Sequence, residues 1–235
     1  MIRAMIFDLD GTLVDTEAIH LAAFAKVMKD LGIVVAEEDY WNRLIGYSDR
    51  DCFRLMLGEH GRKSDPAAVA TLIARKTVEY QAMIAGRDLL YSGAADFVRH
   101  CARRFPLVLA TGTLRHEAES ILRSAKLREL FVDIVAAEDV DCGKPAPDAF
   151  VAALGRLGFL LRQRNAIEPE ECLAVEDTPA GIEAASSAGM KVLAVGHTSK
   201  VAALAAADLI RPSLAETDLD DVLRQLSLGE GSAGR

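Results

Sequence analysis

The chain has 235 residues, with 27 lysines and arginines against 35 aspartates and glutamates, and a formal net charge of −8. Hydrophobic residues make up 51% and charged residues 26% of the chain, which argues against disordered and fibrous architectures and indicates a folded soluble domain with a smaller module inserted or appended. Proteins that bind nucleic acid present positive charge to phosphate backbones, so the acidic balance disfavours a general nucleic-acid binder.

The apolar runs are short. Residues 2–7 and 107–110 are far below the roughly 20 residues that cross a bilayer, so we expect no membrane span. Asp8 interrupts the first run before it reaches the length of a secretory signal core, which indicates a cytoplasmic protein. The cysteines form no C-x-x-C pair, so we expect buried or partly buried thiols and not disulfides or metal ligands. They are Cys52, Cys101, Cys142 and Cys172.

The first predicted strand lies at the start of the chain, and from about residue 90 onward short apolar segments alternate with amphipathic ones. This alternation is typical of a parallel sheet with helices on both faces, so the fold class is α/β, a Rossmann-like doubly wound sheet. The predicted strands are 3–7, 107–110, 133–136, 172–175 and 191–195, with a short edge strand at 209–210. The predicted helices are 94–104, 115–125, 148–157 and 180–188.

Residues 15–86 interrupt this alternation and are expected to be helical throughout. A first amphipathic helix is expected to end at Gly32. Asp65 followed by Pro66 predicts the N-cap and the first turn of a second long helix. An all-helical segment directly after the first strand predicts a small cap over the end of that strand.

The chain is therefore divided into two expected domains and a tail. Residues 1–14 and 87–226 form the Rossmann-like core, and residues 15–86 form the helical cap, with hinges near Asp15 and Arg87. The last segment, 227–235, is rich in small polar residues and is expected to be disordered.

Three predicted strands end in polar side chains. Because ligands collect beyond the carboxyl ends of parallel strands, these side chains are expected to meet at one rim. The residues concerned are Asp8 and Asp10, Thr111, and Glu176 and Asp177. Four crowded carboxylates resist joint ionisation and need a cation, which a hard divalent ion such as Mg²⁺ supplies. Lys144, between a predicted strand and a helix, reaches the same rim as a second positive charge.

Each feature has a purely structural alternative. Asp10-Gly11 is a common turn dipeptide, the carboxylates at 176 and 177 are suited to capping a helix that begins near Pro179, and a single lysine is usually solvated. Their coincidence at the strand ends of one α/β chain favours a chemical role.

These residues resemble four motifs of one family. The segment Asp8-Leu9-Asp10-Gly11-Thr12 resembles the first motif of the haloacid dehalogenase superfamily phosphohydrolases. Thr111 resembles the second motif, Lys144 in Gly-Lys-Pro-Ala-Pro-Asp the third, and Glu176-Asp177 the fourth. The resemblance covers nearly the whole chain, including a helical cap between the first motif and the next strand.

The resemblance implies a role for each motif. Asp8 would attack phosphorus and form an aspartyl-phosphate, and Asp10 would act as general acid and then as general base. The Mg²⁺ ligands would be Asp8, the backbone carbonyl of Asp10, and Asp177, with Glu176 helping directly or through water. The phosphoryl oxygens would be held by Lys144, by Thr111 and by the amides that follow it at Gly112 and Thr113.

The resemblance is greatest to the branch of beta-phosphoglucomutase-like enzymes and sugar or phosphoglycolate phosphatases. Haloacid dehalogenases usually lack an acid at the place of Asp10, so dehalogenation is not expected. Mutases of this branch tend to carry an arginine directly after the cap serine, whereas here Asp49 follows Ser48 and Arg50 comes one residue later. We therefore predict a Mg²⁺-dependent phosphatase of a small phosphorylated metabolite. The alternatives are a phosphosugar mutase and a regulatory module that binds phosphate without turnover.

Four further cations are candidates for contacting the substrate, namely His20, Arg50, Lys76 and Arg115. Three of them have a structural alternative: His20 as the boundary residue of an apolar helix, Lys76 beside Arg75 as part of a solvated face, and Arg115 as a helix start.

One segment has no account from the family. Residues 159–168 form an elongated connection, for which we expect a longer surface loop or an extra helical turn; the alternative is an oligomer contact through residues 159–161. The oligomeric state is left open.

Overall fold

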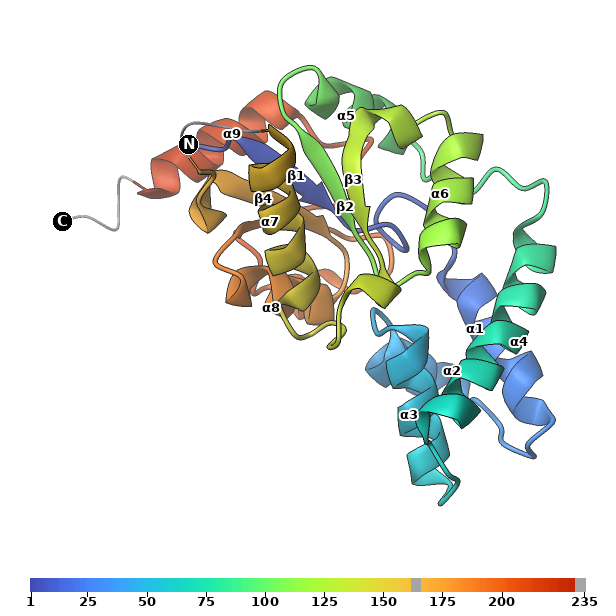
Figure 1. Ribbon diagram of the computed structural model, residues 1–235. Coiled ribbons are helices and arrows are strands. Elements are labelled where there is room, and N and C mark those ends of the chain that lie inside the picture. The colour runs from blue at the N-terminus through green and yellow to red at the C-terminus, as the bar shows by residue number, and fades with distance from the viewer. Residues whose placement is uncertain (162–165, 231–235) are drawn as a thin grey trace.

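The computed structural model describes residues 1–161 and 166–230 (Figure 1). Within them, six parallel strands form one sheet in the order β3-β2-β1-β4-β5-β6. The strands are β1 (Ala4–Phe7), β2 (Leu107–Ala110), β3 (Phe131–Val135), β4 (Cys172–Glu176), β5 (Lys191–Val195) and β6 (Leu209–Arg211). Every predicted strand is present, and the α/β fold class is confirmed.

The helices fill the predicted gaps. They are α1 (Glu17–Lys29), α2 (Glu37–Asp39), α3 (Asp49–Glu59), α4 (Pro66–Ile84), α5 (Ala94–Ala102), α6 (Arg115–Ser124), α7 (Asp148–Leu161), α8 (Pro179–Ser187) and α9 (Leu219–Glu230), with a π-helical turn at Tyr40–Leu44. Short 3-10 turns cover Arg128–Leu130, Ala137–Asp139, Pro169–Glu171 and Val201–Leu204. Helix α9 was not predicted, although Leu219, Val222 and Leu226 share a buried face at helical spacing.

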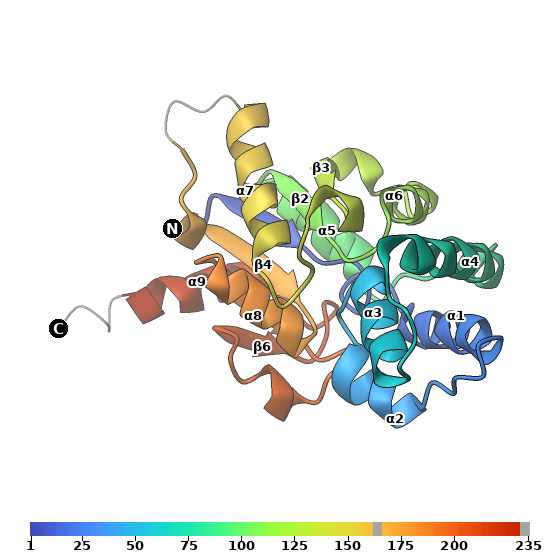
Figure 2. The same ribbon diagram turned by 60° about the horizontal axis from the view of Figure 1, so that its bottom comes forward.

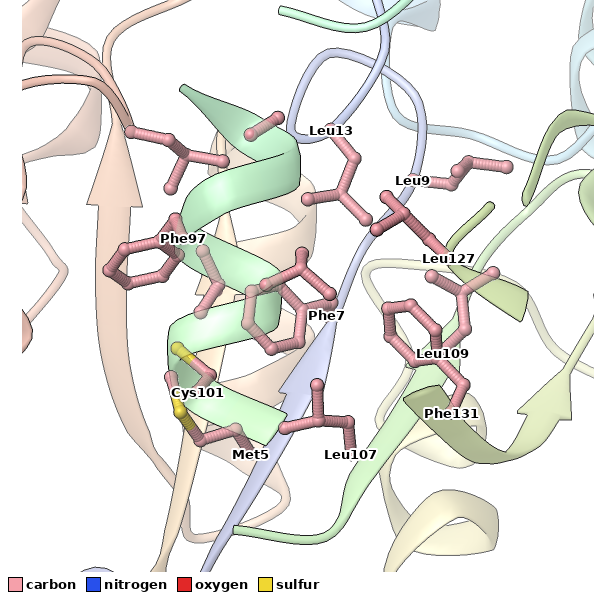
Figure 3. Packing of buried hydrophobic residues seen from close by; sticks show 14 of the residues in the cluster. Met5, Phe7, Leu9, Leu13, Phe97, Cys101, Leu107, Leu109, Leu127 and Phe131 are labelled. Carbon is pink, nitrogen blue, oxygen red and sulfur yellow. The ribbon is translucent and has the colours of Figure 1, made fainter. Parts of the chain in front are cut away.

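Helices cover both faces of the sheet (Figures 1 and 2). Helices α5, α6 and α9 pack on one face, and α7 and α8 on the other. Alternate residues of β1 point to opposite faces, so Phe7 packs between Phe97 of α5 and Phe131 of β3 (Figure 3), with ring centroids 6.2 and 6.0 Å away, while Ile6 joins Phe150 of α7. Burial on both faces explains why β1 is an unbroken apolar run.

Helices α1 to α4 form a separate group to one side of the sheet, visible in both ribbon views. They have an apolar cluster of their own, in which Phe24, Tyr40 and Phe53 are central. The two segments that connect this group to the sheet run side by side: the Asp15 amide donates to the Leu89 carbonyl at 2.8 Å, and the pair continues as an antiparallel bridge between Val14 and Leu90. All four helices fall within the predicted cap, 15–86.

Two predicted segments differ from the structure at their edges. Helix α9 runs to Glu230, so residues 227–230 are helical and not disordered, because the buried Leu226 anchors the end of that helix. Residues 231–235 lie outside the described residues.

The elongated connection begins with an extra helical turn, since α7 continues to Leu161, and the side chain of Phe159 there is 82% exposed. Residues 162–165 of that connection also lie outside the described residues.

Three of the four cysteines are buried free thiols, as expected. Cys142 is exposed, contrary to the expectation, because it lies in the surface loop between β3 and α7. No helix in the described part of the chain is both long and apolar enough to cross a membrane.

Candidate active site

The candidate site lies where four strand ends converge. Asp8 directly follows β1, Thr111 follows β2, Lys144 lies between β3 and α7, and Glu176 ends β4. Strand β1 pairs with β2 on one side and with β4 on the other, so the chain reverses its direction of winding at β1. Such a switch point leaves a crevice beyond the strand ends, and this topology brings residues far apart in sequence to one rim.

The turn after β1 depends on a glycine. Gly11 has φ of +77°, in the left-handed region, and a Cβ there would lie 2.1 Å from Oδ2 of Asp177. The turn is closed by the amides of Leu13 and Val14, which both donate to the carbonyl of Leu9. A side chain at position 11 would therefore disrupt both the turn and the carboxylate beside it.

A buried lysine joins two carboxylates at the centre of the rim. Lys144 Nζ donates to Asp8 Oδ1 and to Glu176 Oε1, each at 2.5 Å. Burial raises the pKa of Asp8 well above its ordinary value, although Lys144 opposes this shift. Burial lowers the pKa of Lys144, but the two carboxylates outweigh it and keep the pKa above its usual value, so the ammonium stays charged.

Three carboxylates form a potential cation site. Oxygen atoms of Asp8, Glu176 and Asp177 lie within 4.8 Å of one another, and all three residues are buried. Asp177 accepts hydrogen bonds from the hydroxyls of Thr12, at 2.8 Å, and Thr198. Burial, and then the neighbouring carboxylates, raise the pKa of Asp177 well above normal.

The charges of this cluster do not balance, since three carboxylates face one ammonium group. Uncompensated buried charge is costly, and a small divalent cation with oxygen ligands would offset it. The residues present therefore fit a Mg²⁺ ion. The carboxylate of Asp10 is not part of the cluster, in keeping with the predicted use of its backbone carbonyl alone.

Asp10 instead turns its carboxylate toward the helical group. Oδ1 accepts from the Thr16 hydroxyl at 2.6 Å and lies 3.1 Å from His20 Nε2, while Oδ2 accepts from the Thr113 hydroxyl and lies 3.5 Å from that of Thr111. Burial would raise the pKa of Asp10, but His20 and the two closer hydroxyls hold it well below its ordinary value. Asp10 is thus a carboxylate within hydrogen-bond reach of both domains.

A chain of polar contacts runs from Asp10 into the helical group. His20 Nδ1 lies 2.7 Å from Lys76 Nζ, which also forms an ion pair with Asp49. Because an ammonium group only donates, Nδ1 accepts and Nε2 carries the ring proton toward Asp10. The His20 ring stacks on Tyr80 with centroids 4.3 Å apart.

The expectation that Lys76 lies on a solvated face was wrong. His20 is buried, and Lys76 is only 1% exposed, whereas the neighbouring Arg75 lies on the surface and pairs with Asp30. A signal was present in the sequence, because Lys76 shares the buried face of α4 with Val69, Leu72 and Tyr80 at spacings of three and four residues.

Two predicted substrate contacts lie elsewhere. Arg50 donates to the carbonyls of Val140 and Asp141, the shortest contact being 2.7 Å, and so connects the helical group to the loop after β3. Arg115 donates to the carbonyl of Ile134 and pairs with Asp139. Neither arginine lines the pocket at Asp8. Oxygen atoms of the core already bind both guanidinium groups. The structure therefore does not support the expectation that these two arginines contact the substrate.

The pocket itself is small and lined by both parts of the molecule. Of the predicted residues, Asp8, Asp10, His20, Gly112, Thr113 and Lys144 line it. The rest of its wall is formed by Glu17, Phe24, Tyr40, Gly46, Tyr47, Asp49 and Thr178. Most of these lie on helix faces or turns, where the strand-end argument gives no signal. Thr198, by contrast, comes shortly after β5, and the same argument applied to a fourth strand would have found it.

The helical group rests directly on the core. Gly46 has φ of +81°, and a Cβ there would lie 2.7 Å from the Thr178 hydroxyl. The pocket between the two parts has a volume of about 30 Å³.

Comparisons with known proteins agree with this geometry. The model of the haloacid dehalogenase-like hydrolases matches residues 2–189. Fructose-1-phosphate phosphatase YqaB of Escherichia coli is 31% identical over 81% of this chain and 95% of its own length. Beta-phosphoglucomutase of Bacillus subtilis is also 31% identical, over 83% of this chain and 84% of its own length.

A crystal structure shares the fold. Beta-phosphoglucomutase from Clostridium difficile superposes with a TM-score of 0.86, covers 98% of this chain and 99% of its own, and is 22% identical, a likeness that concerns the fold alone. The family match spans more than half of the chain and confirms the resemblance inferred from the four motifs. The chain is an enzyme that belongs to the haloacid dehalogenase-like hydrolase family.

Proposed function

We propose that this enzyme is a Mg²⁺-dependent phosphatase that hydrolyses a small phosphorylated metabolite through an aspartyl-phosphate. The observation that carries the proposal is the buried contact of Lys144 with Asp8, beside two further carboxylates and opposite Asp10. A relative named as a fructose-1-phosphate phosphatase supports a substrate of the sugar phosphate class.

Asp8 acts as the nucleophile in this proposal. A carboxylate oxygen of Asp8 attacks phosphorus, and the alcohol leaves, which divides one difficult displacement into two easier ones. Lys144 fixes Asp8 through Oδ1 and brings positive charge to the transferring phosphoryl group. Thr111 and the amides of Gly112 and Thr113 bind the phosphoryl oxygens from the side of β2.

Asp8, Glu176, Asp177 and the backbone carbonyl of Asp10 would hold the Mg²⁺ ion. When bound, the ion supplies charge neutralisation for the phosphoryl oxygens. Thr12 and Thr198 orient the carboxylate of Asp177, and the amides of Asp177 and Thr178 orient that of Glu176, at 3.0 and 3.4 Å.

Asp10 transfers the protons. In its first role Asp10, in its protonated form, gives its proton to the leaving oxygen. In its second role it is the base that activates water for attack on the aspartyl-phosphate. The contacts of His20 with Lys76 fix the imidazole in the orientation that both roles need.

We further propose that residues 15–86 act as a cap whose opening admits substrate. The enclosed pocket is too small for a sugar phosphate, and the paired segments near Asp15 and Leu89 are the connections about which the cap turns. Closure excludes water from Asp8 until the alcohol has left.

A phosphosugar mutase is the second candidate, favoured by the 31% identity to a beta-phosphoglucomutase. The two reactions differ in whether the aspartyl-phosphate is discharged to water or to a sugar hydroxyl. Asp49 after Ser48 favours hydrolysis, because a mutase holds a second phosphate, and here an acid stands at that place.

The test is phosphate release from a panel of phosphorylated metabolites, with Mg²⁺ or with chelator, by the wild type and by Asp8→Asn. Release that requires Mg²⁺ and is lost in the variant is the expected result. Isomerisation of sugar phosphates without release would identify a mutase. Phosphate binding without either reaction would identify a regulatory module and contradict the proposal.

A further inference from the structure

The wall of the pocket opposite Asp8 is acidic. It is formed by the cap, which contributes the carboxylates of Glu17 and Asp49 together with the rings of Phe24, Tyr40 and Tyr47. The Tyr40 hydroxyl donates to Glu17 at 2.5 Å, so Glu17 presents an acceptor. This wall faces whatever the substrate carries beyond its phosphate group.

The cations near this wall are already paired. Lys76 lies behind it, held by Asp49 and His20, and it does not line the pocket. Of the described residues that do line the pocket, the basic side chains are His20 and Lys144; His20 contacts Asp10, and Lys144 contacts Asp8 and Glu176. Each basic side chain that lines this pocket therefore already has a carboxylate partner.

Two arginines of the cap lie outside this pocket. Arg50 binds carbonyl oxygens of the loop after β3 and lines a smaller adjoining cavity with Thr111, Gly112 and Lys144. Arg43, paired with Asp39 and Glu59, lines a separate groove of about 480 Å³ together with Lys200.

The electrostatic consequence follows from charge and burial. A second phosphate or a carboxylate would face the carboxylates of Glu17 and Asp49, of which only Asp49 is paired with an ammonium group, and like charges in a confined space repel. Hydroxyl groups suit the same wall, because carboxylate oxygens are acceptors and aromatic rings pack against the carbon face of a sugar.

We propose that the substrate is the monophosphate ester of an uncharged polyhydroxy alcohol, and that Asp49 excludes esters with a second anionic group. This inference rests on the proposed phosphatase function and narrows it. Within the two substrate classes expected from the sequence, it selects sugar or polyol monophosphates and rejects the phosphoglycolate type.

The first test compares matched substrates on the wild-type enzyme with Mg²⁺. Glycerol 3-phosphate and 3-phosphoglycerate differ by a hydroxymethyl against a carboxylate group, and fructose 1-phosphate and fructose 1,6-bisphosphate differ by one phosphate. We expect kcat/KM to be at least about tenfold higher for the less charged member of each pair, the effect of about 1.4 kcal/mol. Equal values, or a preference for the more charged members, would overturn the inference.

The second test changes the wall. In Asp49→Asn the repelling carboxylate is gone and the Lys76 ammonium is released, so the ratio within each pair should fall toward one. Asp51→Asn is the matched control, because Asp51 lies on the same helix, bonds to Ser48 and does not line the pocket. If the ratio of kcat/KM within each pair is unchanged in Asp49→Asn, Asp49 does not discriminate against a second anionic group. The wild-type comparison stands without this variant if Asp49→Asn fails to fold.

The two proposals fail in different ways. If p-nitrophenyl phosphate and every metabolite are left intact by the wild type, the phosphatase function itself is wrong. If phosphate is released and the more charged esters are preferred, the function holds and only the substrate class is wrong.

Discussion

The core rim and the cap wall both bury a lysine between two polar partners, yet they are built in different ways. At the rim, Lys144 joins Asp8 to Glu176, and all three residues stand at or beyond the ends of parallel strands. In the cap, Lys76 joins Asp49 to His20, and all three lie on helices. In the proposed mechanism the rim holds the groups that react, whereas the cap wall positions Asp10 and faces the leaving alcohol. The sheet topology thus determines where the proposed reacting groups lie, and the packing of the cap helices determines which groups face the rest of the substrate.

The largest difference is expected in turnover. Asp8→Asn should lower kcat by about 10⁴-fold or more, because it removes the nucleophile, whereas Lys76→Met should lower kcat by about 10²-fold, because it only loosens the orientation of His20. Steady-state kinetics on one good substrate measures both. Equal losses in the two variants would mean that the rim and the cap network share the reaction and would break the comparison.

The free energy of unfolding should also fall further when the rim lysine is replaced than when the cap lysine is replaced. Lys144→Met leaves two buried carboxylates without their partner and is expected to cost about 3–5 kcal/mol in the free energy of unfolding. Lys76→Met leaves one, Asp49, and should cost less. Denaturant unfolding without Mg²⁺ measures this, with the exposed Lys200→Met as a control that should change little. A smaller loss for Lys144→Met than for Lys76→Met would contradict the account.

The buried carboxylate of Glu117 has no such partner among the described residues. Burial raises the pKa of Glu117 on α6 from 4.5 to about 7, and no ion pair is formed with it among the described residues. The folded protein therefore binds this proton more tightly than the unfolded chain. Its contribution to stability is complete below about pH 4.5 and is lost as the pH rises through about 7.

Glu117→Gln should therefore stabilise the protein at pH 8, by up to about 3 kcal/mol, and have little effect at pH 4.5. Thermal or denaturant unfolding at the two pH values measures it. The matched control is Glu119→Gln on the same helix, because a hydrogen bond from Arg123 lowers the pKa of that exposed carboxyl. A variant that is less stable than the wild type at pH 8 would contradict this prediction.

The smallest effect concerns metal binding at the rim. Mg²⁺ should raise the stability of the wild type by about 2.7 kcal/mol at a concentration one hundred times the dissociation constant. In Asp177→Asn this gain should largely disappear, since a ligand and an uncompensated buried charge are removed together. Asp49→Asn, on the cap wall, should keep the gain. Metal-dependent stabilisation that survives in Asp177→Asn would move the metal away from this cluster.

The rim was readable from the sequence because topology alone determines it. Parallel strands present their carboxyl ends to one edge, so an acid after one strand and a lysine before a helix meet wherever that sheet forms. Asp8, Lys144, Glu176 and Asp177 were found in this way.

The cap wall was less readable because helix rotation and packing determine it. Asp49 drew attention only as a departure from the mutase pattern, and Glu17 and Tyr40 were not singled out at all. Arg50 was expected at the substrate because its charge suits a phosphate, yet carbonyl oxygens across the interface bind it. The periodicity of α4 was sufficient to predict that Lys76 is buried, but the adjacent cations Arg75 and Lys76 were interpreted as a solvated face.

The central claim is that Asp8 carries the phosphoryl group during turnover. The most direct measurement is acid quenching of the enzyme during hydrolysis of a good substrate with Mg²⁺, followed by mass spectrometry of its peptides. The account predicts one added phosphoryl group on the peptide that contains Asp8, absent in Asp8→Asn and in the presence of chelator. Rapid hydrolysis by Asp8→Asn, or a phosphoryl group on any other residue, would contradict it.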